Sequence, residues 1–406
     1  MAFIESLVDV EFVKDLVCSQ GKTHEEVSNI LKEMFPETTR GLGEKSVYRF
    51  CKEHGLRRTK SDAELDVTVR NAVSMVGPVY GRKMLKGFLD SRAKIVVASE
   101  KRIGSSLARV KPDNHRRRQQ NIARQINPTP YVATHFGHKL HIDQNEKLVR
   151  YGATHVGAID GFSRFVTAFT TMPIKNNLLI YDNIYRKTVL DFGMFDQVRT
   201  DHGKEFVLIQ FVQETLAHLR RNVDIDPHRQ TESKHNLPIE RFWVEINGRA
   251  NYPIKRVLVD MEARDEIDMD NNETKYCVSW VTRKLVSIAT HNTVESWNNH
   301  CIPRRGKPVI LRDSNNLAQV IDPIYLPACD EAVQVYENLG GRLTMEPQFG
   351  EYLLNGDEDL QTSRELLWLN NVPDVNVICG HLVNDLDHSF RHAVNSFCDL
   401  TRQLSA

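Results

Sequence analysis

Apolar residues repeat at helical spacing through the first part of the chain. In THEEVSNILKEMF they fall on one helix face, and Thr23 followed by Glu26 predicts a capping box at its start. A later helical pattern, SVYRFCKEHGL, ends at Gly55. Together with FVKDLVCSQ, these patterns predict three short helices over residues 5–58.

Basic residues gather on or just after the last of these helices, at Arg49, Lys52, Arg57 and Arg58. Because this arrangement is typical of helix-turn-helix units, we predict that residues 1–60 bind DNA; the alternative is a small structural bundle. Residues 61–110 carry two more helical patterns and a basic third, KRIGSSLARV. We predict a second helical DNA-binding unit there.

From about residue 138 short strand patterns alternate with helical ones. HKLHID, VGAID, FVTAFT and QVRT are typical of strands, whereas NLLIYDNIYRKTVLDFG, EFVLIQFVQETLAHL and the longer LPIERFWVEINGRANYPIKRVLV are typical of helices. This order predicts an α/β layered domain over residues 138–260. Residues 261–340 return to helical patterns, and we treat 341–406 as a separate acidic region.

Composition narrows the class of protein. The 406 residues include 53 Lys and Arg against 53 Asp and Glu, and no apolar run approaches the roughly 18 residues that span a bilayer. The first residues lack a basic segment, so we expect neither a secretory signal nor a membrane partner. Seven scattered cysteines without a CxxC pair favour reduced thiols in the cytosol or nucleus.

The charge is unevenly distributed although the net charge is zero. Residues 101–124 hold eight Lys and Arg against one Asp, whereas residues 346–387 hold nine Asp and Glu against one Arg. We interpret 111–137 as an extended basic linker, in which Arg116, Arg117 and Arg118 would contact DNA phosphates. The alternatives are a solvated linker and a nuclear import signal. The acidic region would bind a partner, cap the fold or fold back on the linker.

Three acidic residues stand where predicted strands end or a helix begins: Asp143 in HIDQNEKL, Asp201 in VRTDHGKEF and Glu240 in HNLPIERFW. In α/β sheets such positions converge on one crevice. Clustered carboxylates repel unless a cation lies between them. Hard oxygen ligands favour Mg²⁺ or Mn²⁺, and two such ions stabilise an in-line displacement at phosphorus.

These motifs together resemble the integrase catalytic core of retroviruses, retrotransposons and DDE transposases. The resemblance rests on HIDQNEKL, AIDGFSRFVTAF, VRTDHGKEF and SKHNLPIERFW, in that order, with 57 residues between the aspartates and 38 between Asp201 and Glu240. It implies an α/β RNase H-like core with a mixed five-stranded sheet and flanking helices. Helix-turn-helix units would precede this core, and a mostly helical C-terminal region would follow it.

The resemblance also implies roles for individual residues. Asp143 would bridge two metal ions, Asp201 would complete one ion's ligands and Glu240 the other's. Lys204 and Asn236 would contact DNA, with Lys234 and Arg241 as weaker candidates on charge alone. The expected enzyme cleaves phosphodiesters and transfers DNA strands in the nucleus, acting on transposon ends and target DNA as a homo-oligomer.

Two other functions stay open: a catalytically silent DNA-binding protein derived from a transposon, and a nuclease that hydrolyses nucleic acid without joining strands. The sequence also departs from the family. Trp243 stands where Asn is frequent, no zinc-binding His/Cys module precedes the core, and 261–406 match no known module. Near the triad, we expect Asp160 to stabilise a turn, Glu205 to be a helix N-terminal acid, and His202 to face solvent. His141 shares the strand face of Asp143.

Overall fold

The computed structural model describes residues 3–38, 40–57, 60–92, 98–114, 131–231, 236–343 and 348–405. Of the predicted DNA-binding residues, Arg58 and the linker residues Arg116, Arg117 and Arg118 lie outside these ranges, as does Lys234. The suggested contact between the acidic region and the basic linker therefore also falls outside them.

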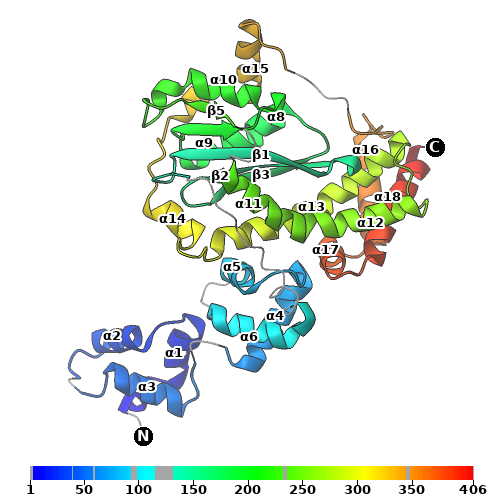
Figure 1. The fold of residues 1–406 in the computed structure, drawn as a ribbon. Helices are drawn as coiled ribbons and strands as arrows, with labels where there is room; N and C mark the ends of the chain where they lie inside the picture. The colour runs from blue at the N-terminus through cyan, green and yellow to red at the C-terminus, as the bar shows by residue number, and fades with distance from the viewer. Residues whose placement is uncertain are drawn as a thin grey trace.

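The N-terminal unit consists of short helices around its own core, and Figure 1 shows it apart from the rest of the chain. Its elements are η1 Phe3–Ser6, α1 Val10–Lys14, η2 Asp15–Ser19, α2 His24–Met34 and α3 Glu44–Glu53. Thr23 and Glu26 form the predicted capping box at the start of α2. The apolar faces of α2 and α3 meet through Val27, Leu31 and Phe50, which are fully buried.

The next three helices do not form a separate core. They are α4 Asp62–Val76, α5 Arg82–Arg92 and α6 Glu100–Val110, and their apolar residues join one cluster with Ile159, Phe242 and Trp297 of the following domain. A Cβ at Gly87 of α5 would overlap with the carbonyl oxygen of Ser296. The absence of a side chain thus allows close helix packing, and the predicted unit 61–110 is structurally part of the core domain.

A five-stranded mixed sheet forms the centre of the protein. Its strands are β1 Lys139–Leu148, β2 Ala153–Asp160, β3 Val166–Met172, β4 Gln197–Thr200 and β5 His228–Gln230, in the order β3-β2-β1-β4-β5. The first three pair antiparallel, whereas β4 and β5 add in parallel. The predicted strand patterns and the α/β layers are confirmed.

Helices cover both faces of the sheet (Figure 1). One face buries Leu140 and Ile142 under α8 Asn177–Ile180, η4 Tyr181–Arg186, α9 Lys187–Phe192 and α10 Val207–Thr215. Because side chains alternate along a strand, Lys139, His141 and Asp143 point to the opposite face. That face lies towards α11 Leu237–Ile246, whose Ile239 and Trp243 pack near Gly157 of β2.

The rest of the chain is mostly helical, and most of it packs into a further core. Leu326 and Ala332 instead join the core between the sheet and α10. The elements of this part of the chain are η8 Asn247–Asn251, α12 Tyr252–Ala263, α13 Asn272–Asn299, α14 Pro308–Ser314, α15 Cys329–Asn338, α16 Glu358–Asn371, α17 Val375–Val383 and α18 His388–Ser405. The apolar residues of α12, α13, α16, α17 and α18 form one cluster with Leu148 and Tyr151. The predicted boundaries at 260 and 340 therefore divide elements that share a core, and α16–α18 are a packed part of the fold.

None of the helices in the described ranges is both long and apolar enough to cross a bilayer.

Candidate active site

Asp143 lies inside β1, the central strand of the sheet. The prediction that a strand ends at Asp143 is wrong, because β1 continues to Leu148. Its residue is 5% exposed, and its Cα partner across β2 is Gly157. The strand alternation that buries Ile142 on one side turns Asp143 to the α11 side. The backbone of Asp143 is held by its pairing with β2, whereas the pairing of β1 with β4 ends at His141.

Asp201 and Glu240 reach the same region from two other elements. Asp201 directly follows β4, the parallel neighbour of β1, and its Oδ1 accepts a hydrogen bond of 3.0 Å from the Gly203 amide. Glu240 stands in the first turn of α11, which has Pro238 near its start. Acidic side chains are favoured at this end of a helix because the free backbone N–H groups are positive.

The three carboxylates line one open pocket of about 470 Å³. Its other lining residues are Gln144, Asn145, Glu146, Lys147, Lys175, Gly203, Glu205, Trp243 and Asn247. Within the described ranges, however, no three His, Cys, Asp or Glu side chains lie close enough together to ligate one metal ion. The triad thus shares a pocket without forming a closed ligand set.

The carboxylates influence one another electrostatically. Burial raises the pKa of Asp143 to about 7, and the charges of Glu240 and Asp201 add to this rise. Burial also raises the pKa of Glu240, with nearby Lys147 lowering it and Asp201 raising it. The pocket therefore disfavours its own negative charge and would favour a cation between these groups.

Trp243 contacts Asp143 directly. Its indole Nε1 donates a hydrogen bond of 2.9 Å to Asp143 Oδ2, and its ring is 4% exposed. This bond lowers the pKa of Asp143 against the effect of burial. The departure from the family's frequent Asn thus places a hydrogen-bond donor on the central aspartate, which sequence reasoning missed because the contact joins residues a hundred positions apart.

Lysines that sequence reasoning did not select also line the pocket. Lys175 Nζ lies 3.0 Å from Glu146 Oε1 and 3.6 Å from Glu205 Oε1. Glu205 is 9% exposed and faces the pocket, so it is more than the helix N-terminal acid that we expected. Lys175 precedes the short helix α8 in a polar loop, and nothing in the local sequence marks it as a site residue.

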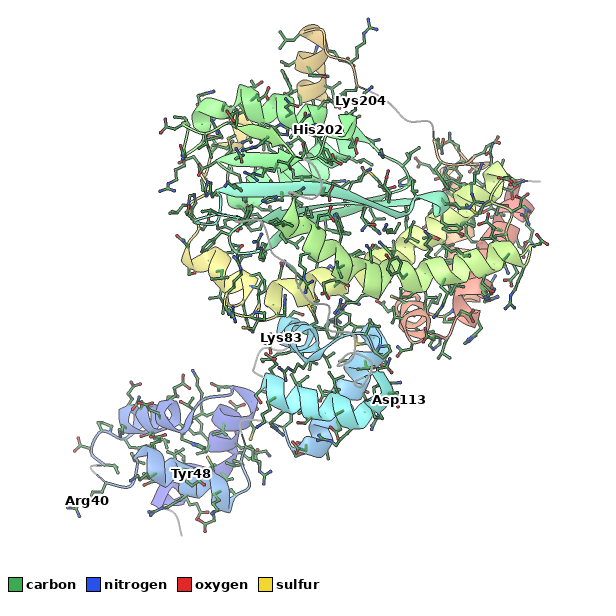
Figure 2. All side chains as sticks on the ribbon, in the orientation of Figure 1. Arg40, Tyr48, Lys83, Asp113, His202 and Lys204 are labelled. Carbon is green, nitrogen blue, oxygen red and sulfur yellow. The ribbon has the colours of Figure 1, made fainter. Side chains whose placement is uncertain are left out.

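The residues predicted to bind DNA that lie within the described ranges differ in their exposure. Lys204 is exposed beside the pocket, and Figure 2 shows it with His202 near α8 and β5. Asn236 is 1% exposed, and its Oδ1 is bonded to His141 Nδ1. The prediction that Asn236 touches DNA is therefore not supported, because its side chain connects β1 to the start of α11.

On the N-terminal unit, Arg49, Lys52 and Arg57 are exposed. Arg49 and Lys52 share a helical face of α3 with Tyr48, which is 52% exposed and labelled in Figure 2. This face is accessible to a partner. By contrast, two basic residues of α6 are engaged within the protein: Arg102 pairs with Asp62, and Arg109 pairs with Asp66.

The neighbouring polar residues mostly have structural roles. Asp160 is fully buried, and its Oδ2 accepts hydrogen bonds from the Ser163 hydroxyl and the Phe162 amide, which confirms it as a turn-stabilising residue. His202 is exposed, as expected. His141 is fully buried and does not line the triad pocket.

The donor chemistry of the pocket fits Mg²⁺ or Mn²⁺. Its candidate ligands are carboxylate oxygens, which these hard cations prefer, and the pocket is open enough to admit water and phosphate oxygens. Asp143, Asp201 and Glu240 are the residues that would hold the ions. Small side-chain movements towards one another would be needed, since the three are not within a common ligand distance.

Comparison with known proteins agrees with this geometry. Residues 132–311 match the family model of the integrase core domain. The sequence matches none of the curated proteins. The matched segment contains all five strands, α11 and the three carboxylates of the pocket. Residues 132–311 are therefore an integrase core domain of the RNase H-like type.

Proposed function

We propose that this chain is a DDE-type polynucleotidyl transferase that cleaves DNA phosphodiesters and transfers DNA strands. The observation that supports it most is the meeting of Asp143, Asp201 and Glu240 in one pocket of an integrase core domain. Bound divalent cations would neutralise charge on the reacting phosphate and stabilise the attacking and leaving oxygens. Asp143, Asp201 and Glu240 are the residues that would hold these cations.

The remaining pocket residues would prepare the site. Trp243 holds the orientation of Asp143 through the hydrogen bond to Oδ2. Lys147 and Lys175 place positive charge beside the carboxylates, where a DNA phosphate would otherwise be repelled. The exposed face of α3 would contact DNA outside the core. Transposon ends and target DNA are the proposed substrates, the nucleus is the proposed compartment, and a homo-oligomer would bring two ends together.

Product analysis tests this function. The purified chain is incubated with supercoiled plasmid and short duplexes bearing free 3′-hydroxyls, in Mg²⁺ or Mn²⁺. Strand transfer predicts plasmid molecules covalently joined to the duplex. Nicked plasmid without joined species would instead identify a hydrolytic nuclease. The absence of both products would contradict the enzymatic proposal.

A catalytically silent DNA-binding protein is the second candidate, and one observation favours it. The described residues contain no set of three side chains at common metal-ligand distance. This candidate predicts salt-dependent DNA binding with no metal-dependent product in the same assay.

The bond from Trp243 to Asp143 gives a further prediction. Trp243→Phe keeps most of the buried ring but removes a hydrogen bond to a charged group, for which about 1.5–3 kcal/mol is typical. We expect the rate of strand cleavage to fall about 10–100-fold, with little change in DNA affinity. Single-turnover cleavage and anisotropy measure the two quantities.

Trp368→Phe is the matched control, because the Trp368 indole Nε1 donates a hydrogen bond of 2.8 Å to the backbone oxygen of Ala393 in the C-terminal core. Its cleavage rate should stay within a few-fold of wild type. Equal rates in the Trp243 variant and wild type would show that the bond does not position Asp143.

A further inference from the structure

Five basic residues gather on the α11 side of the sheet, beyond the triad pocket. We call them the basic cluster: Lys139, Arg164, Arg199, Arg229 and Arg305. Lys139 lies four positions before Asp143 on β1 and so shares its face. Arg199 on β4 is the Cα partner of His141, and Arg229 on β5 is in turn the partner of Arg199. The cluster and the triad therefore occupy one sheet face.

Tyr131 organises the cluster. The guanidinium carbons of Arg164 and Arg199 lie 4.9 and 6.0 Å from the centre of its ring, and Lys139 Nζ lies 5.6 Å away. His141 is fully buried between these groups. Because His141 Nδ1 faces the acceptor Oδ1 of Asn236, His141 Nε2 accepts from the Tyr131 hydroxyl at 2.6 Å.

This chain of bonds connects the basic cluster to the triad. Tyr131 holds His141, and His141 holds Asn236, which stands at the start of α11 four residues before Glu240. A Cβ on Gly161 would overlap with the Tyr131 hydroxyl, so the glycine makes room for the ring. The ring and the cations around it are thus fixed relative to the carboxylates.

The positive charge of the cluster is poorly compensated within the protein. In the described ranges, none of its five members forms an ion pair with a carboxylate. Burial and the charge of Arg305 lower the pKa of Arg164 to about 10. Burial and the charges of Arg199 and Arg229 lower the pKa of Lys139. Asp160 is near Arg164 and Tyr131. Its Oδ2 is bonded within its own turn, and its Oδ1 accepts a hydrogen bond from the Gly137 amide.

One guanidinium nitrogen in the cluster has no partner. Arg164 NH1 is buried without a hydrogen bond in the described structure. Arg229 and Arg305, by contrast, are exposed. Like charges held side by side, with unused donors, are stabilised by an anion that contacts several of them at once.

We propose that the basic cluster binds consecutive backbone phosphates of the duplex DNA whose scissile phosphodiester occupies the triad pocket. This proposal rests on the proposed function, because that function places the scissile phosphodiester of the DNA in the triad pocket. Asp143 lies four positions after Lys139 on β1, about 13 Å at the rise of a strand. That length corresponds to about four base steps of B-DNA. The cluster would therefore contact DNA flanking the reaction site and hold it across the sheet.

The salt dependence of DNA binding tests the cluster without requiring catalysis. Binding of the full chain to a 30-base-pair duplex is followed by anisotropy in EDTA over a range of salt concentrations. Arg229→Gln/Arg305→Gln changes two exposed residues. If both contact phosphates, the slope of log affinity against log salt becomes less steep by about 1.8. Arg229→Lys/Arg305→Lys keeps both charges and should retain most of the wild-type slope.

Arg186→Gln/Lys187→Gln is the matched control, because η4 and α9 lie on the other sheet face. It should leave the slope close to wild type. A slope in the Arg229/Arg305 double variant equal to that of the control, with unchanged thermal unfolding, would overturn the proposal. The proposal would also be overturned if the Arg229/Arg305 double variant lost affinity only for an RNA duplex or an acidic polypeptide and not for the DNA duplex.

The result separates the two proposals. A reduced slope in a chain that makes no metal-dependent product would support the DNA-binding face while rejecting catalysis. Metal-dependent cleavage with an unchanged slope would retain the enzyme and reject the cluster as its DNA contact.

Discussion

Replacing Asp143 by Asn should reduce metal-dependent DNA cleavage at least about a thousandfold, a loss of about 4 kcal/mol of transition-state stabilisation. Asp143 is the central carboxylate of the pocket, and its amide keeps the side-chain volume while removing the charge that would hold cations. Asp201→Asn and Glu240→Gln should have effects of similar size. Gel analysis of plasmid nicking in Mg²⁺ and Mn²⁺ measures the loss.

The control for this series is Glu214→Gln, an exposed carboxyl on α10 whose Oε1 accepts a hydrogen bond from Gln210. It should cleave within a few-fold of wild type. If the three triad variants also formed product at the wild-type rate, the assignment of the triad would be wrong.

The same Asp143→Asn variant should be more stable than wild type above neutral pH. The folded-state pKa of Asp143 is about 7, against an ordinary value of 3.8. The folded protein therefore holds a proton that the unfolded chain has lost, so wild-type stability falls as pH rises from about 4 to about 7. The shift corresponds to a penalty on the order of 4 kcal/mol at pH 8.

Thermal unfolding in EDTA, measured between pH 4.5 and pH 8, checks this prediction. The unfolding midpoint of Asp143→Asn should lie close to wild type near pH 4.5 and several degrees above it at pH 8. Other titrating groups occur in both proteins, so their contributions largely cancel. Asp224→Asn, at an exposed carboxyl, should show no such pH-dependent difference. A constant difference across the range would mean that burial of Asp143 does not destabilise its ionised form.

Local patterns predicted much of the fold. The capping box at Thr23, the strand carrying Asp143 and the helix that begins near Glu240 all depend on residues close in sequence. The longer helical pattern LPIERFWVEINGRANYPIKRVLV corresponds to α11, the π-helical turn η8 and α12 in succession. In each case short-range spacing and turn chemistry determine the element.

Long-range packing could not be predicted in this way. Gly87 in α5 gives no sign that it packs against Ser296, and the acidic composition of 346–387 conceals helices that share a core with α13. The domain boundaries were placed by changes in composition, whereas the cores depend on contacts between residues more than a hundred positions apart.

The candidate site likewise contains some residues that local sequence indicates and others that depend on long-range packing. The triad residues were selected because each was predicted to end a strand or begin a helix, although β1 in fact continues past Asp143 to Leu148. Trp243 and Lys175 were missed as site residues because their roles depend on the neighbours that folding brings to them. Asn236 is the opposite case: its position in the motif indicates a DNA contact, yet its side chain is buried and bonded to His141.

Binding of Mn²⁺, followed by electron paramagnetic resonance, most directly tests whether Asp143, Asp201 and Glu240 form a divalent metal site. The wild-type chain should bind up to two Mn²⁺ ions, and each single amide variant should bind fewer or bind them more weakly. The triple variant Asp143→Asn/Asp201→Asn/Glu240→Gln should lose this binding. Equal Mn²⁺ binding by the wild type and the folded triple variant would contradict the metal-dependent mechanism.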